Sequence, residues 1–99
     1  MVNKDRSTRN NNKKSALQVL FVCDLKPNAK EVYLAGEFNG WNPRSDRMQK
    51  RNGRFEKKMR LTPGEHHYKF VIDGEWYADP SASMQVPNDY CGSNSVIRV

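Results

Sequence analysis

The sequence predicts an all-β domain, an antiparallel β-sandwich of about seven strands that is immunoglobulin-like in general form. Short runs of alternating or continuous apolar residues recur along the chain, and turn signals separate them about every eight to twelve residues. No stretch longer than a turn shows sustained helical periodicity. A chain of 99 residues is long enough for one domain with a modest core.

The first predicted strand covers residues 16–25, where apolar residues occupy most positions on both faces, as expected of a strand in a sandwich. A turn at residues 26–29 separates it from a second strand at residues 32–36. The next segment, residues 37–43, carries two aromatic residues among turn-forming residues, which predicts a shaped loop.

A hairpin is predicted around Asn52-Gly53, a dipeptide that suits a tight two-residue turn. Its strands are residues 48–50 and residues 55–61, and the second alternates apolar with charged positions. Nearer the C-terminus we expect a short edge strand at residues 83–86, a loop at residues 87–92 and a closing strand at residues 94–99.

The most informative stretch is PGEHHYKFVIDGEWYADP, residues 63–80. It reads as a strand that ends at an Asp73-Gly74 turn and is followed by a partner that stops at Asp79-Pro80. Alternation places Tyr68, Phe70 and Ile72 on a core face and Lys69 on the outward face. Trp76 follows in a short polar loop with no obvious core to enter.

The positive charge is concentrated at the N-terminus. Five basic residues and one acidic residue give residues 1–14 a net charge of +4 out of +6 for the whole chain. This segment is Asn-rich and poor in apolar residues, so we expect a disordered basic tail at residues 1–14 and a folded domain at residues 15–99. The tail would add weak attraction to polyanions. Because the folded part is nearly neutral, nucleic acid is not the expected partner, and a tail contact to it stays a third hypothesis.

Neither a membrane span nor a signal-peptide core is visible in the sequence. Cys23 and Cys91 lie far apart and lack metal-ligand spacing, so free thiols in a reducing compartment are preferred. A bridge between them remains the alternative if the first and last strands are neighbours. We therefore expect a cytoplasmic protein with no membrane contact.

Catalytic patterns are missing from the sequence. His66 and His67 are adjacent in a strand and face opposite ways, so they do not readily serve one site. The acidic residues that could form a catalytic pair sit in or beside turns, where acids are common for structural reasons. There is no recognised metal-ligand motif and no Gly-rich phosphate loop before a helix. The expectation is a protein without catalysis, cofactor or metal.

Four segments together carry a resemblance to a known family: VYLAGEFNGWN at residues 32–42, PGEHHYKFVIDGEW at residues 63–76, Asp79-Pro80, and NSVI at residues 94–97. In this order they resemble the family 48 carbohydrate-binding modules. These modules include the glycogen-binding domain of AMP-activated protein kinase beta subunits and the early-set domains of isoamylases and branching enzymes. The resemblance runs from about residue 16 to residue 99. It implies an early-set β-sandwich that binds α-1,4-linked glucans without catalysis.

The resemblance also implies which residues form the sugar site. The two tryptophans of the family match Trp41 and Trp76, its lysine matches Lys69, and its asparagine matches Asn94. A leucine that enters the curve of the glucan in the kinase subunits corresponds to Tyr90 or Cys91. The candidates for secondary contacts are Asn39, Asn42, Glu75, Tyr90 and Ser93.

Each of these residues also has a simpler structural explanation. A tryptophan in a β protein is more often part of the core, and a lone strand lysine is usually solvated. Phe38 is expected to plug the core beneath the Trp41 loop. The basic residues around the Asn52-Gly53 turn are by default a solvated edge, with an acidic partner as the alternative: Arg44, Arg47, Lys50, Arg51 and Arg54.

Two readings of the function follow. In the first, the domain localises itself or a partner to a glycogen-like or starch-like polysaccharide. In the second, it is a structural or protein-interaction early-set module that supports a glucan-active enzyme or kinase and binds no sugar.

Overall fold

The computed structural model describes residues 16–88 and 92–99. Within these residues there are eight strands and one short 3-10 turn, which confirms the all-β prediction and adds one strand to the expected seven. The elements are β1 (Leu17–Cys23), β2 (Val32–Gly36), the turn η2 (Glu37–Asn39), β3 (Gln49–Arg51), β4 (Arg54–Leu61), β5 (Glu65–Ile72), β6 (Glu75–Tyr77), β7 (Met84–Pro87) and β8 (Ser93–Arg98).

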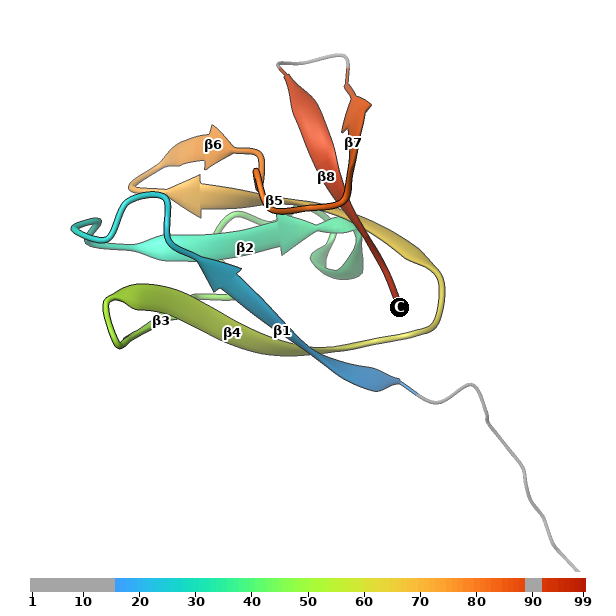
Figure 1. Cartoon of the computed structure of the whole chain (residues 1–99), viewed down its shortest axis with the longest axis horizontal. Coiled ribbons are helices and arrows are strands. Elements are labelled where there is room, and N and C mark those ends of the chain that lie inside the picture. Colours follow the sequence, from blue (N-terminus) through green and yellow to red (C-terminus); the bar gives the residue numbers. More distant parts are fainter. Residues whose placement is uncertain (1–15, 89–91) are drawn as a thin grey trace, which may run out of the picture.

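The strands form two antiparallel sheets. One sheet has the order β1-β4-β3, and the other has the order β2-β5-β8-β7 with β6 paired to β5. Figure 1 shows β3 and β4 below β2, β5 and β6, with the β7–β8 hairpin rising at one end. This arrangement agrees with the predicted sandwich.

The core lies between the two sheets and follows the predicted alternation. On β5 the side chains of Tyr68, Phe70 and Ile72 are buried in the core cluster, where they meet Phe21 and Leu34 from β1 and β2. The rings of Phe21 and Tyr68 lie edge to face with centroids 4.9 Å apart, a favourable aromatic geometry. Phe38 packs partly buried against the same cluster, as predicted.

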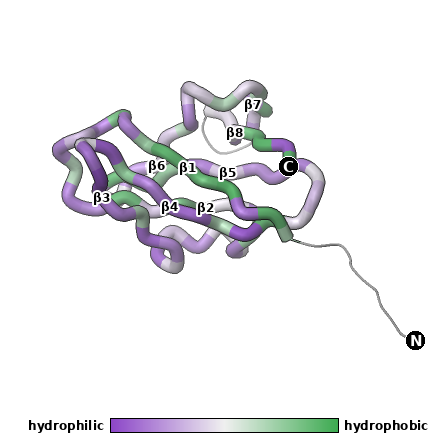
Figure 2. The backbone as a smooth tube through the Cα atoms, turned by 60° about the horizontal axis from the view of Figure 1, so that its bottom comes forward, coloured by the Kyte–Doolittle hydropathy of each residue, from purple (hydrophilic) through white to green (hydrophobic). Residues whose placement is uncertain are grey.

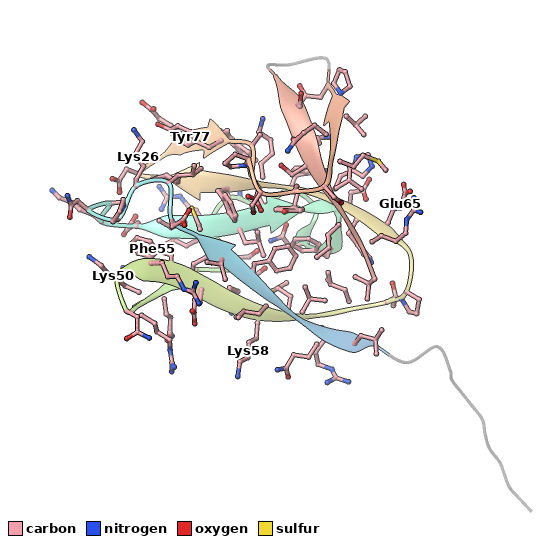
Figure 3. All side chains as sticks on the ribbon, viewed as in Figure 1. Lys26, Lys50, Phe55, Lys58, Glu65 and Tyr77 are labelled. Carbon is pink, nitrogen blue, oxygen red and sulfur yellow. The ribbon has the colours of Figure 1, made fainter. Side chains whose placement is uncertain are left out.

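The outer face of the β1-β4-β3 sheet carries an exposed apolar residue. β1 is hydrophobic along much of its length (Figure 2), but Leu20 points outward and is 48% exposed. It lies opposite Lys58 of β4, which also points away from the molecule (Figure 3). The apolar outer face of this strand is therefore not packed inside the sandwich.

Two tight turns appear where the sequence predicted them. Asn52-Gly53 joins β3 to β4 with φ angles of 52° and 82°, and Asp73-Gly74 joins β5 to β6 with φ angles of 48° and 87°. Positive φ at both central residues is the requirement of a type I′ hairpin turn. The Asp73 carboxylate also accepts the backbone N–H groups of Lys30 and Glu31, which ties the β1–β2 connection to this turn.

Cys23 is a free, buried thiol, and burial raises its pKa. Cys91, Tyr90 and the predicted basic tail at residues 1–14 lie outside the described residues. The described part of the chain contains no helix long and apolar enough to cross a membrane.

Candidate functional site

Lys69 occupies the point at which β5 changes its strand partner. On one edge residues 68–72 of β5 pair with β2, and Lys69 lies opposite Ala35. On the other edge residues 65–68 pair with β8, whereas residues 70–72 pair with β6. Lys69 falls between the two ladders, on the outer face of the sheet.

The Lys69 side chain is buried despite facing outward. It is only 6% exposed, and its Nζ donates a hydrogen bond to the Ser93 carbonyl at 3.0 Å. This corrects the picture of a solvated strand lysine. The ammonium is held in one place beside β8, and a buried ammonium needs such acceptors to offset its loss of water.

Trp76 lies on β6 rather than in a polar loop. It is paired with Val71 of β5, and residues paired across antiparallel strands share a face of the sheet. Trp76 therefore stands on the same outer face as Lys69, and it is 41% exposed. The sequence interpretation was right that this ring does not enter the core and wrong about the element that carries it.

Trp41 follows η2 in a strained backbone conformation. Its φ angle is 61°, directly after Gly40 at 66°, and its N–H donates to the Gly36 carbonyl at 2.8 Å. A bulky residue with positive φ is uncommon and is retained only where the surroundings enforce it. Gly36 lies opposite Tyr68, the residue that precedes Lys69. The hydrogen bond to Gly36 therefore holds the Trp41 backbone close to Lys69.

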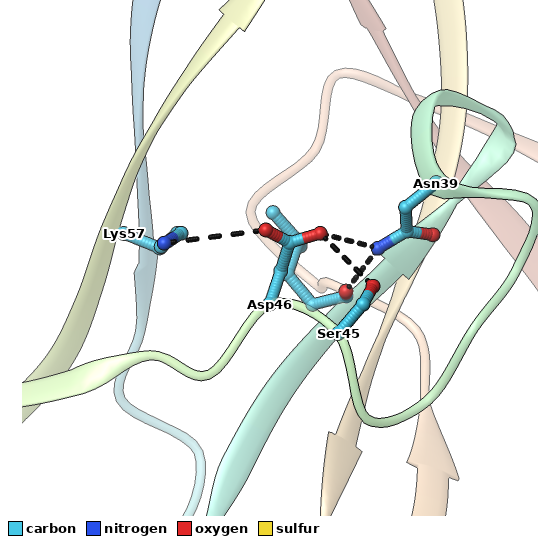
Figure 4. A network of polar contacts seen from close by, with 5 residues as sticks. Asn39, Ser45, Asp46 and Lys57 are labelled. Carbon is cyan, nitrogen blue, oxygen red and sulfur yellow. Dashed lines mark hydrogen bonds and ion pairs between the residues drawn. The ribbon is translucent and has the colours of Figure 1, made fainter.

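The side chain of Asn39 holds the loop that carries Trp41 through hydrogen bonds. Its Oδ1 accepts the Gly36 N–H at 3.0 Å, and its Nδ2 donates to the Leu34 carbonyl and to Asp46 Oδ2 at 2.9 and 2.8 Å. Asp46 also pairs with Lys57 of the other sheet at 4.0 Å (Figure 4). The side-chain amide of Asn39 thus links β2, the Trp41 loop and the opposite layer.

Gly36 is required by space at the start of this loop. A Cβ at this position would lie 2.6 Å from the His67 carbonyl oxygen and 2.7 Å from the Phe38 ring. The motif GEFNGW therefore begins with a residue that lets two elements approach closely.

Asn94 joins the site from β8. Its neighbour Ser95 lies opposite Tyr68, so the register brings Asn94 towards Lys69 on the outer face. Its Oδ1 accepts a hydrogen bond from Asn88 Nδ2 at 2.9 Å. The backbone thus gathers the four predicted residues around one section of β5: Trp41, Lys69, Trp76 and Asn94.

A buried polar network lies behind this site. Tyr68 donates its hydroxyl to Asp79 Oδ2 at 2.6 Å, and Ser95 Oγ accepts the Asp79 N–H at 2.7 Å. Burial, together with the hydrogen bond to the Asp79 carboxylate, raises the pKa of Tyr68. Tyr68 precedes Lys69 and Ser95 follows Asn94, so the network fixes both strands at the site.

The sequence alone did not reveal this network. Asp79 was interpreted as a turn residue, although an inward tyrosine on β5 signalled that a buried hydroxyl needed a partner. Tyr33 was also missed: Val32 and Leu34 are core residues, so alternation alone places this aromatic ring on the outer face.

Three candidates for secondary sugar contacts already accept hydrogen bonds from other residues of the chain. Asn42 Oδ1 accepts the Arg44 N–H at 2.8 Å, and Glu75 Oε1 accepts the Tyr77 hydroxyl at 3.0 Å. The Ser93 carbonyl accepts from Lys69. Tyr90 cannot be placed among the described residues.

Other parts of the described chain offer weaker sites. Among its His, Cys, Asp and Glu side chains, no group of three or more is arranged to hold a metal ion. A hollow of about 460 Å³ lies between the β1–β2 connection and Tyr77, with Lys26 Nζ 5.7 Å from the Tyr77 ring centroid (Figure 3). It is larger than the hollow beside Trp76 but contains neither tryptophan nor Lys69.

The chain matches a known protein family. Residues 19–99 match the family described as the glycogen recognition site of AMP-activated protein kinase. The chain is 36% identical over 89 residues to 5'-AMP-activated protein kinase subunit beta-1 of Sus scrofa, covering 90% of this chain and 70% of that sequence. It is 34% identical over 89 residues to Protein PTST homolog 2, chloroplastic, of Arabidopsis thaliana, covering 88% of this chain and 17% of that protein.

A third relative is Protein FLOURY ENDOSPERM 6, chloroplastic, of Oryza sativa subsp. japonica, which is 36% identical over 66 residues. That match covers 67% of this chain and 12% of the rice protein. The chain thus spans less than a fifth of the two chloroplastic relatives. With most of its length matched, the chain belongs to the family of glycogen recognition domains of AMP-activated protein kinase.

Proposed function

We propose that this domain binds α-1,4-linked glucans of the glycogen or starch type, without catalysis, through Trp41, Lys69, Trp76 and Asn94. The observation that carries the proposal is the position of Lys69 where β5 changes partner. Three contacts support it: Trp76 pairs with Val71, Ser95 beside Asn94 pairs with Tyr68, and the Trp41 N–H donates to the Gly36 carbonyl.

The chemistry of these side chains suits a glucan. A glucan chain presents apolar C–H faces between rims of hydroxyl groups, so its binding requires flat aromatic rings and a few fixed polar groups. The two indoles provide the rings, and Lys69 and Asn94 provide the polar groups. Because Lys69 is already held by Ser93, little side-chain entropy is lost when a sugar binds.

The expected affinity is modest. If each indole loses about 60 to 100 Å² of apolar surface to a sugar, it contributes roughly 1.5 to 2.5 kcal/mol. Association and ordering cost about 4 kcal/mol or more. The dissociation constant for short oligosaccharides is then on the order of 10 μM to 1 mM. Such a module gains from the repeated sites of a polymer.

This affinity suits localisation of the chain, or of an attached glucan-active enzyme or kinase, to a polysaccharide. Relatives whose names identify kinase subunits support that role. The cytoplasm remains the expected compartment, although relatives named as chloroplastic widen the alternatives.

Retention on glycogen tests the proposal. Replacing both Trp41 and Trp76 by alanine removes both aromatic surfaces, so we expect binding to fall below detection. Lys69→Ala should act in the same direction. Tyr77→Ala, which removes an aromatic ring outside the proposed face, should retain binding. Thermal unfolding of each variant separates lost binding from lost folding, and strong retention by the double tryptophan variant would refute the proposal.

One observation favours the second reading, a protein-interaction module. Leu20 is exposed opposite Lys58 on the uncovered face of the β1-β4-β3 sheet, far in the fold from Lys69, which lies in the other sheet. Isothermal titration with maltoheptaose or β-cyclodextrin distinguishes the two readings, because an interaction module without sugar binding would give no heat of binding.

A further inference from the structure

Three residues form a row across the outer face of the β2-β5-β6 region. Tyr33 of β2 lies opposite Val71 of β5, and Val71 lies opposite Trp76 of β6. Paired residues share a face, and neighbouring strands are about 4.8 Å apart, so the two aromatic residues stand roughly 10 Å apart with Val71 between them.

This row forms the floor of a shallow hollow. Its volume is about 170 Å³, and its lining combines the three residues of the row with four others: Glu31, Pro43, Arg44 and Gly74. Pockets that enclose drug-sized ligands measure roughly 300 to 1,000 Å³. The hollow is therefore of a size for a single sugar ring or a similarly small group.

The rim of the hollow carries one group of each charge. Arg44 follows the Trp41 loop and Glu31 precedes β2, and both side chains are exposed. In the part of the chain that the structure describes, neither side chain makes a hydrogen bond or an ion pair. A guanidinium offers several donors and a carboxylate offers acceptors, which together suit the hydroxyl groups of a neutral sugar.

We infer that Tyr33, Arg44 and Glu31 form a second sugar subsite, contiguous with Trp76, which takes the stretch of the same α-glucan chain that continues past Trp76. The inference rests on the proposed function and deepens it, because it predicts a preference for longer chains.

Two features favour a continuing neutral glucan over a separate ligand. Trp76 belongs both to the hollow and to the proposed site around Lys69, so a chain that stacks on this ring lies at the hollow. The opposite charges of Glu31 and Arg44 cancel, so the hollow has no net attraction for a phosphate or another anion.

The experiment is isothermal titration of the full chain with maltotriose and maltoheptaose. The variants are Arg44→Ala and Tyr33→Thr, where threonine keeps a high preference for strands. Removal of a subsite that only a longer chain reaches should weaken maltoheptaose binding about five- to tenfold and leave maltotriose binding within about twofold of the wild type. Arg51→Ala removes an exposed arginine that does not line the hollow, and it should bind both sugars like the wild type.

The possible outcomes are distinct. Equal losses of affinity for both sugars would assign Tyr33 and Arg44 to the first site. Unchanged maltoheptaose binding would show that the bound glucan does not occupy the hollow. Either result overturns the inference while the proposed function stands. If Tyr33→Thr fails to fold, Arg44→Ala decides alone, because its side chain is exposed and its removal leaves the strands intact. A wild-type chain that binds neither sugar would overturn both proposals.

Discussion

At the residue scale, the hydroxyl of Tyr68 helps to fix the strand that carries Lys69. It donates to the buried carboxylate of Asp79, whose other oxygen accepts from the backbone N–H and the hydroxyl of Ser81. In Tyr68→Phe, one carboxylate oxygen loses its partner inside the fold. A hydrogen bond to a charged group is worth about 1.5 to 3 kcal/mol, so we expect the free energy of unfolding at pH 7 to fall by about 2 kcal/mol in urea titrations.

The same residue makes stability depend on pH. Burial and the Asp79 hydrogen bond raise the pKa of Tyr68, so the native state keeps its proton where the unfolded chain releases it. The stabilisation is complete below the unfolded pKa of about 10 and is lost as pH rises above it. The wild type should lose up to about 1.4 kcal/mol per pH unit more than Tyr68→Phe above pH 10. A gap between the two proteins that stays constant from pH 7 to pH 11 would contradict this assignment.

At the scale of elements, the Trp41 loop depends on one asparagine side chain beneath it. Asn39→Ala removes three hydrogen bonds at once, to Gly36, Leu34 and Asp46. We expect a loss of about 1 to 3 kcal/mol in the free energy of unfolding and weaker glucan binding, because Trp41 is no longer held in its left-handed conformation. Urea unfolding and titration with maltoheptaose measure the two effects.

Ser45→Ala is the matched control for this loop. Its hydroxyl makes one exposed hydrogen bond of 3.2 Å to the same Asp46 carboxylate, so stability should change by less than about 0.5 kcal/mol. If Asn39→Ala were as stable as this control and yet lost sugar binding, Asn39 would be a direct sugar contact rather than a support of the loop.

The elements themselves were predictable because alternation and turn chemistry are local. The order of apolar residues in β5 fixed its core face, and Asn52-Gly53 and Asp73-Gly74 specified their turns. The burial of Lys69 was not predictable, because it depends on where β8 lies along β5. That register is a long-range property, set in part by the buried contacts of Tyr68, Asp79 and Ser95.

At the scale of the whole molecule, charge and sugar recognition are separated. Residues 1–14 carry a net charge of +4 out of +6, whereas the proposed site relies on two tryptophans, one lysine held by a carbonyl and one asparagine. Stacking of indoles on sugar faces is insensitive to salt. Attraction between a basic tail and a polyanion is screened over about 8 Å at physiological ionic strength and about 3 Å at 1 M.

Deletion of residues 1–14 therefore tests the third hypothesis and the glucan proposal together. We expect the shortened chain to bind maltoheptaose as the full chain does, from low salt to about 1 M, because the four site residues and their supports all lie within residues 16–99. Any retention of the full chain on DNA should weaken steeply with salt and vanish on deletion. Titrations of both chains at several salt concentrations measure this.

Two outcomes would contradict these expectations. Loss of sugar binding on deletion would place the basic segment in the glucan site. DNA binding that survives deletion would move the polyanion contact to the basic residues around the β3–β4 turn.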